Sequence, residues 1–312
     1  MCIITTEDIE AQKQAWLKIT KTNIFARHSS DDKQLIAYSL SIASQSAAAM
    51  ILPLPVKLNS GDNALRFINL RAYSNFFDDL SNACVPEVEP LEDMLSEDFD
   101  VPVAAGAPPM LAVQEVGDYE ASFVPSMDDF NRLDPRFRLP QEIWQKMPDY
   151  SDYGFAVFQL KIALTKDDQE VENNIHPMAF EFVTRNPEKL FFPTVHVHDG
   201  DFHHQAGFYH KFYCQRDNAR AEYKYQRDLF ENQPPFPAQK KSLHGEYYFG
   251  GYSWFYQSQD VAGKDFPWQN SEGLVNPDKK LYAMDLIGNY PNHDMWLGDV
   301  WQSRNTHQNQ EE

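Results

Sequence analysis

Five of the ten histidines in this chain fall within fifteen residues, beginning at His196. Because residues i and i+2 of a strand face the same side, His196 and His198 would share a face. Asp199-Gly200 favours a tight type I′ turn, after which an antiparallel strand would bring back His203, with Asp201 beside it. Two histidines on one strand and a third on its neighbour can hold zinc or another transition metal that prefers imidazole.

This pattern predicts a metal site in which His196, His198 and His203 are ligands and Asp201 orients an imidazole. A water molecule in the fourth position would have a lowered pKa, so such a site suits a hydrolytic enzyme. Two other interpretations use the same residues. The histidines could be ordinary hairpin residues that pair with neighbouring aspartates, or they could exchange protons without any metal.

Cys2 is a second residue whose position could support catalysis. If Met1 were removed, the free amine of Cys2 could act as the base for its own thiol, as in N-terminal-nucleophile amidases. The apolar pair Ile3-Ile4 could form the strand that this mechanism needs, whereas residues 7–16 have a helical pattern that argues against it. The alternative is an inert terminal cysteine.

The net charge of −19 is concentrated in one part of the chain. Residues 72–131 hold fourteen aspartates and glutamates and contain no lysine, arginine or histidine. The densest part, residues 86–102, is interrupted by prolines and lacks a calcium-loop pattern, so we predict a surface loop there. That loop is either simply solvated or a docking surface for a basic protein partner. The acidic balance argues against nucleic acid and anionic membrane surfaces as partners.

The first residues show no basic segment followed by an apolar one, so we expect no secretory signal. The longest uncharged stretch, Gln34–Val56, is long enough to cross a bilayer, but it contains serines and glutamines and ends in Leu-Pro-Leu-Pro. It therefore predicts buried strands, and we expect no membrane partner. The three cysteines, Cys2, Cys84 and Cys214, are odd in number and far apart, which predicts reduced thiols in a cytoplasmic protein.

Apolar runs between breakers predict mostly strands as the elements that would position these residues. The expected strands are Thr22–Ala26, Leu35–Ala43, Ala48–Val56, Leu65–Leu70, Met110–Val116, Tyr119–Val124, Phe155–Leu164, Met178–Val183, Phe191–His198 and Gly207–Tyr213. Helices are expected at Tyr73–Leu80, just after Ser126, and at Asn218–Phe230. There is no regular alternation of strand and helix, so the fold class is predicted as α+β, β-rich, with a mixed or antiparallel sheet and a few short helices.

Two regions are expected. Residues 1–215 would form the β-rich α+β domain, and residues 216–312 would form a helix followed by an irregular, aromatic-rich extension packed on it. The aromatic cluster 247–256 fits core packing better than stacking on a sugar or a base, because only Lys240 and Lys241 lie nearby.

Short strand segments in the first region also occur, in the same order, in a known family. They are Ala49–Val56, Val116–Glu120, Leu139-Pro140 with Tyr153-Gly154, His176–Phe182 and Leu190–Val195. Over residues 30–215 the chain thereby resembles an uncharacterised bacterial family, domain of unknown function 2330. The resemblance implies a bacterial protein, and it carries no activity, cofactor or catalytic residue. The histidine-rich stretch is not part of it.

Overall fold

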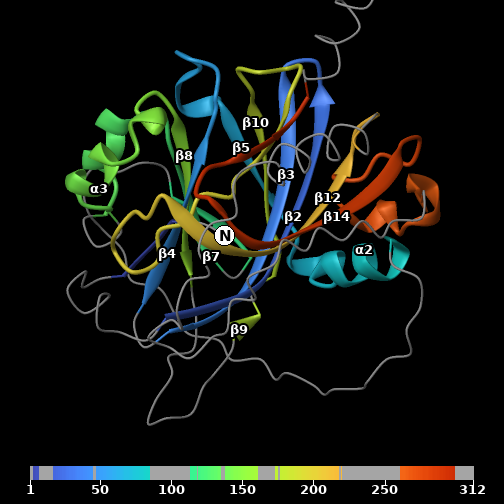
Figure 1. The fold of residues 1–312 in the computed structure, drawn as a ribbon. Coiled ribbons are helices and arrows are strands. Elements are labelled where there is room, and N and C mark those ends of the chain that lie inside the picture. The colour runs from blue at the N-terminus through green and yellow to red at the C-terminus, as the bar shows by residue number, and fades with distance from the viewer. Residues whose placement is uncertain are drawn as a thin grey trace, which may run out of the picture.

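The computed structural model describes residues 3–6, 17–44, 47–84, 113–117, 119–134, 138–160, 173–174, 176–217, 219 and 261–298 (Figure 1). Within these residues two large sheets carry the fold, with mixed and antiparallel pairing and a few short helices. This architecture confirms the predicted α+β class.

The smaller of the two sheets has five strands and is antiparallel throughout. Its order is β1 (Ile3–Thr6), β4 (Ala48–Leu54), β8 (Gly154–Leu160), β7 (Tyr119–Val124) and β6 (Gln114–Val116). The turn between β6 and β7 lies where Gly117-Asp118 predicts it. Gly117 has a φ of 64°, and a Cβ there would lie 2.2 Å from Nε2 of His176, so only glycine fits.

The larger sheet has eight strands and is mixed, because β12 pairs with β2 in parallel. Its order is β13 (Val261–Ala262), β14 (Lys280–Pro291), β12 (Gln205–Gln215), β2 (Leu17–Ser30), β3 (Lys33–Ser44), β10 (Met178–Val183) and β5 (Leu65–Asn69), with β9 (Asn173–Asn174) on β3. A separate pair joins β11 (Leu190–Phe192) to β15 (Met295–Leu297).

Short helices cover the outer faces of both sheets, as Figure 1 shows for α2 and α3. In the part of the chain that the structure describes, the α-helices are α2 (Phe76–Cys84) and α3 (Gln141–Gln145), and the 3₁₀ helices are η1 (Gly61–Asn63), η2 (Arg71–Tyr73), η3 (Met127–Arg132), η5 (Pro148–Tyr150), η6 (Gly263–Asp265) and η7 (Trp268–Asn270). Apolar residues of α2 pack on the larger sheet, and those of η3, α3 and η5 pack on the smaller one.

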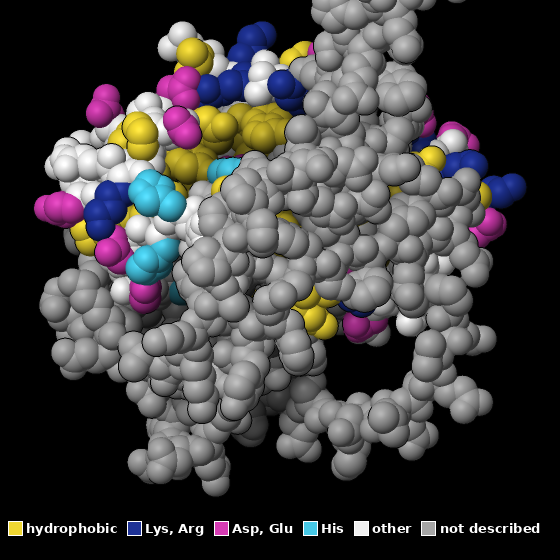
Figure 2. Space-filling view, in the orientation of Figure 1, with side chains coloured by type: hydrophobic (Ala, Val, Ile, Leu, Met, Phe, Trp, Pro, Cys, Tyr) yellow, Lys and Arg dark blue, Asp and Glu magenta, His cyan; other side chains and the backbone are white. Residues whose placement is uncertain are grey.

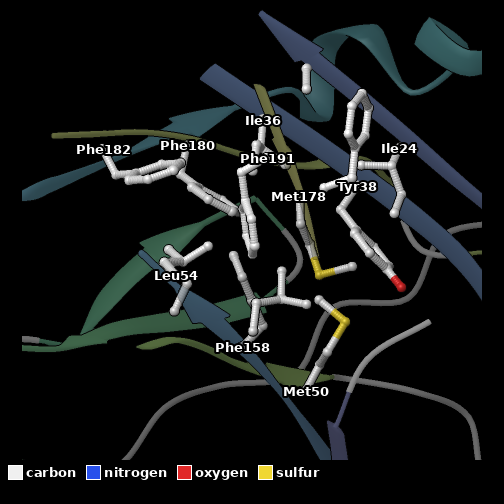
Figure 3. Packing of buried hydrophobic residues seen from close by; sticks show 14 of the residues in the cluster. Ile24, Ile36, Tyr38, Met50, Leu54, Phe158, Met178, Phe180, Phe182 and Phe191 are labelled. Carbon is white, nitrogen blue, oxygen red and sulfur yellow. The ribbon is translucent and has the colours of Figure 1, made fainter. Parts of the chain in front are cut away.

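The main core lies between the two sheets. Strand alternation directs Met50 and Phe158 inward, where they meet Tyr38 and Met178 from the larger sheet (Figure 3). The next residue along β4, Ile51, belongs to the outer cluster under α3. Both faces of the central strands are therefore buried, which explains why their sequences contain continuous apolar runs without charged residues. None of the described helices is long and apolar enough to cross a membrane.

Most of the expected strands coincide with β2–β8, β10 and β12. The prediction of one strand over Phe191–His198 is wrong, because the strand β11 ends at Phe192. Pro193 follows directly, and proline has no N–H to continue a ladder. In the C-terminal region, β14 pairs with β12 over ten residues. Residues 220–260 and 299–312, including the aromatic cluster 247–256 and most of the helix expected at Asn218–Phe230, lie outside the described residues.

Candidate functional site

Residues 194–198, which we call the histidine arm, run beside β1 at the edge of the smaller sheet. The N–H of Ile4 donates to the carbonyl of Val197 over 2.8 Å, and Val197 forms a single parallel bridge with Ile3. Val195 and Val197 pack in the cluster under α3 together with Ile3. Alternation along the arm therefore turns its two histidines to the other side, toward the larger sheet.

The third histidine beside this pair is His210 of β12. The ring of His196 is stacked between its neighbours, with centroids 5.3 Å from His198 and 5.4 Å from His210 and interplanar angles of 20° and 17°. Phe208 lies against His196 at 4.4 Å. The lone pair of an imidazole lies in its ring plane, so rings stacked nearly parallel do not aim their nitrogens at one point. This geometry is typical of packing.

His196 and His210 are 7% and 1% exposed. Burial, with a smaller contribution from nearby His198, lowers the pKa of both imidazoles well below the ordinary value, because a charged ring here would lose its water. Both rings are therefore neutral at pH 7. Nε2 of His196 is buried and makes no hydrogen bond with the described part of the chain.

Residues 199–203, which we call the exposed turn, have a different environment. Asp199 accepts a hydrogen bond from the N–H of Asp201 over 3.1 Å and pairs with Nε2 of His203 over 2.8 Å. The side chains of Asp201 and His203 are 46% and 61% exposed. Asp201 also pairs with Lys146, one residue beyond α3. The hydrogen bonds from Lys146 and from the N–H of Phe202 lower the pKa of Asp201. On the face shown in Figure 2, histidine and acidic side chains gather at the left, over the region of α3.

The predicted hairpin does not form in the described residues. Gly200 does turn the chain, with a φ of 76°, but β12 begins only at Gln205 and pairs with β14 and β2 rather than with the arm. The backbone N–H and C=O groups of β12 form hydrogen bonds with two long strands. This pairing satisfies more of these groups than a short hairpin would. The four predicted ligands are thus divided: His196 and His198 lie in the buried arm, and His203 and Asp201 lie in the exposed turn. Among the described residues, no three His, Cys, Asp or Glu side chains are grouped to hold a metal.

Asn292, just after β14, connects the arm to the turn. Its Oδ1 accepts the N–H of His196 over 2.7 Å, and its Nδ2 donates to the carbonyls of His196 and His203, each over 2.8 Å. Its own N–H donates to the carbonyl of His204 over 2.9 Å. The side-chain amide of Asn292 therefore supplies backbone hydrogen bonds that a neighbouring strand would normally supply.

Asp294 holds the first half of the arm. Its Oδ1 accepts the N–H groups of Thr194 and Val195 over 2.7 and 3.0 Å. Its second oxygen, Oδ2, is buried and makes no hydrogen bond of normal geometry with the described residues, although the Tyr150 hydroxyl is near enough to lower the pKa of the carboxyl. Burial is the larger effect and raises the pKa of Asp294 to about 6.

A cavity of about 330 Å³ lies beside Asp294. Aromatic side chains supply much of its lining: Tyr150, Tyr153, Phe208, Tyr290 and Trp296. Burial and the adjacent Asp294 raise the pKa of the Tyr150 and Tyr153 hydroxyls, so both stay protonated at neutral pH. The cavity combines apolar ring faces with one partly desolvated carboxyl group, and we call it the Asp294 cavity.

Sequence reasoning missed Asn292, Asp294 and Tyr150. A weak signal exists, because Asn-His-Asp (292–294) follows Pro291 within an otherwise aromatic segment. No spacing rule links that tripeptide to an arm about a hundred residues earlier. The pairing arises from the sheet register that places the end of β14 next to the start of β12.

Other predicted features lie elsewhere. Cys2 and residues 86–102 lie outside the described residues. Cys84 and Cys214 are buried, and burial raises the pKa of the Cys84 thiol to about 12, which leaves it unreactive at neutral pH.

No protein-family model and no curated protein matches the chain. Among solved structures it is similar to baculovirus P35, with a TM-score of 0.43 and 12% identity over 96% of this chain and 99% of that one. A mutated baculovirus P35 after caspase cleavage gives a TM-score of 0.39, 12% identity and coverage of 90% and 100%. The complex of caspase-8 with P35 gives 0.40, 11% identity and coverage of 94% and 98%. Similarity at this level assigns neither a fold family nor a partner to this chain.

Proposed function

We propose that the chain is a non-catalytic interaction protein that presents its acidic residues 86–102 to a basic protein partner. The observation that carries this proposal is the distribution of charge. Fourteen carboxylates and no basic side chain occupy residues 72–131, so nothing within that stretch neutralises its field. Such a surface attracts a basic partner over a distance of about a Debye length and selects against acidic ones.

The described residues on either side of this stretch support the proposal, because both are fixed to the sheets. Cys84, the last residue of α2, is buried against the larger sheet, and Val116 of β6 is buried in the main core. Asp78 and Glu115, which lie in these same two elements, are exposed and extend the acidic surface onto rigid structure. The segment is therefore tied at both ends to a stable scaffold, as binding loops commonly are.

The test compares the affinity of the full chain for a lysine-rich peptide with that of a variant whose acidic segment is neutral. The variant replaces the carboxylates of Glu87, Glu89, Glu92, Asp93, Glu97, Asp98 and Asp100 by amides. A matched control neutralises seven exposed carboxylates elsewhere, at Asp31, Glu142, Asp149, Glu188, Asp265, Glu272 and Asp278. Titration calorimetry at several salt concentrations measures both.

We expect the segment variant to bind at least about tenfold more weakly and to lose most of the salt dependence, while the control keeps both. Equal weakening in the two variants would mean that only net charge matters, and would contradict a docking segment.

A further inference from the structure

The Asp294 cavity contains a buried carboxyl group with unused bonding capacity. Oδ1 is occupied by two backbone N–H groups of the arm, whereas Oδ2 has no hydrogen bond of normal geometry with the described residues. Such a buried carboxylate oxygen is costly, since it has lost its water and gained only the nearby Tyr150 hydroxyl in return. A positively charged group in the cavity would stabilise the carboxylate by charge attraction and offset that cost.

Aromatic faces around the cavity favour the same kind of ligand. Tyr150, Tyr153 and Trp296 line it, and such rings attract a cation over their faces. The ring of Tyr153 already interacts in this way with the Arg185 guanidinium, 4.8 Å from its centroid. A second carboxylate, Asp149, lies in the lining and is exposed.

The charge and the size of the cavity further restrict the class of ligand that it can bind. No lysine or arginine is among the described residues that line it. Near neutral pH the Asp294 carboxyl is mostly ionised, because its raised pKa is still only about 6. A volume of about 330 Å³ is at the lower end of the range for small-molecule sites, so it suits a short alkyl chain with one polar head.

We propose that the Asp294 cavity binds an organic cation, an alkylammonium or alkylguanidinium group, with Asp294 as its counter-ion and Tyr150, Tyr153 and Trp296 around the head group. This site does not depend on residues 86–102. The same head group occurs in free amines and in the lysine or arginine side chains of a protein, so the ligand could come from either source.

The first experiment uses the unmodified full chain and four probes of similar size. Butylamine and butylguanidine carry the cation, 1-butanol is the neutral analogue, and butyrate is the anionic one. Saturation-transfer NMR detects binding, and titration calorimetry gives the affinity. We expect both cations to bind at least about tenfold more tightly than butanol, and butyrate not to bind. Equal binding of butanol and butylamine would overturn the proposal, because the cavity would then be merely apolar.

The second experiment uses Asp294→Asn, which keeps an acceptor for the Thr194 and Val195 N–H groups and removes the charge. Butylamine affinity should fall at least about tenfold, whereas Asp149→Asn, which neutralises the exposed carboxyl of the same cavity, should change it less than about twofold. An unchanged affinity in a folded Asp294→Asn variant would also overturn the proposal. Should this variant fail to fold, the comparison of the four probes on the unmodified chain still decides.

The two sources are separated with N-acetyl-lysine-amide and N-acetyl-arginine-amide as further probes. Binding as tight as that of butylamine would mean that the cavity admits a side chain attached to a backbone. Binding of the free amines alone would identify a small-molecule site. Neutralising residues 86–102 should leave butylamine affinity unchanged, so this site and the acidic segment can fail independently.

Discussion

The histidine arm (194–198) and the exposed turn (199–203) follow each other directly in the chain, and their polar groups are satisfied in opposite ways. In the arm, side chains from the end of β14 accept and donate the backbone hydrogen bonds, and the two imidazoles are stacked, with that of His196 buried and neutral. In the turn, charged side chains pair with one another at the surface, where Asp199 and His203 are 58% and 61% exposed. We therefore expect these two adjacent runs to contribute very differently to stability.

The comparison indicates that the stability lost when a polar group loses its partner depends on whether that group is buried or exposed. A buried N–H group of the arm cannot bond to water instead. Losing Asn292 or Asp294 should therefore lower the free energy of unfolding by the full desolvation cost of the unsatisfied group. A carboxylate of the turn loses a partner and gains water, so the net change is small. Substitutions can test this contrast directly, and the expected effects span about an order of magnitude.

Asn292→Ala should have the largest effect. It removes three hydrogen bonds and leaves the N–H and carbonyl of His196 without partners in a buried place. We expect the free energy of unfolding to fall by about 4 kcal/mol, measured by urea denaturation. Asn270→Ala, which truncates the exposed asparagine at the end of η7, is the matched control and should cost less than about 0.5 kcal/mol. A loss below about 1 kcal/mol for Asn292→Ala would mean that water replaces the amide and that the arm is not sealed.

Asp294→Asn should change the pH dependence of stability. The folded-state pKa of Asp294 is about 6, against an ordinary value of 3.8, so the folded protein favours the protonated carboxyl. Its stabilising contribution is complete below the ordinary value and is lost as pH rises through about 6. The asparagine variant lacks this loss. The stability of the variant relative to the unmodified chain should therefore rise by about 2.4 kcal/mol between about pH 4 and pH 7.5.

The measurement is a series of urea denaturations across that pH range, with the variant and the unmodified chain compared at each pH. The Asn270→Ala control should give a flat difference, because it removes no ionisable group. A flat difference for Asp294→Asn would show that the carboxyl is hydrated in the folded state, and a falling one would show that it is held ionised by an unrecognised cation.

The contrast between arm and turn also marks the limit of what the sequence could predict. Alternation correctly placed His196 and His198 on one face, because the period of a strand is a local property. The apolar runs likewise located most of the strands, since burial on both faces leaves a continuous signal. The sequence could not predict which strands pair with each other. Asp199-Gly200 predicts a hairpin, but β12 pairs instead with β14 and β2, which are distant in sequence.

For the same reason, the partners of the arm could not be predicted. Asn292 and Asp294 reach residues 194–196 across about a hundred residues of sequence, and only the register of β12 with β14 brings them there. His210 replaces His203 beside His196 through that same register. The lesson is that residue type and spacing predict which side chains share a strand face, whereas long-range pairing decides what they meet.

His196→Ala should have an intermediate effect and separates packing from metal binding. It removes a buried ring that lies against His198, His210 and Phe208, so we expect a loss of about 2–3 kcal/mol from the cavity left behind. His196→Phe keeps a ring of similar shape and replaces an Nε2 that has no hydrogen bond in the described structure, so it should recover most of this stability. Urea denaturation and metal analysis of untagged protein measure both variants. Zinc that is present in the unmodified chain and lost equally in both variants would instead support the predicted metal site.

Substitution in the exposed turn should have the smallest effect. Lys146 and Asp201 form an ion pair, but their side chains are 48% and 46% exposed, so water screens the attraction and replaces either partner. A double-mutant cycle with Lys146→Ala, Asp201→Ala and the double variant should give a coupling of about 0.5 kcal/mol or less, which vanishes in high salt. A coupling above about 1.5 kcal/mol that persists in high salt would mean that the turn is as desolvated as the arm. The two runs would then differ in sequence pattern and not in environment, and the small cost expected for the turn would have no physical basis.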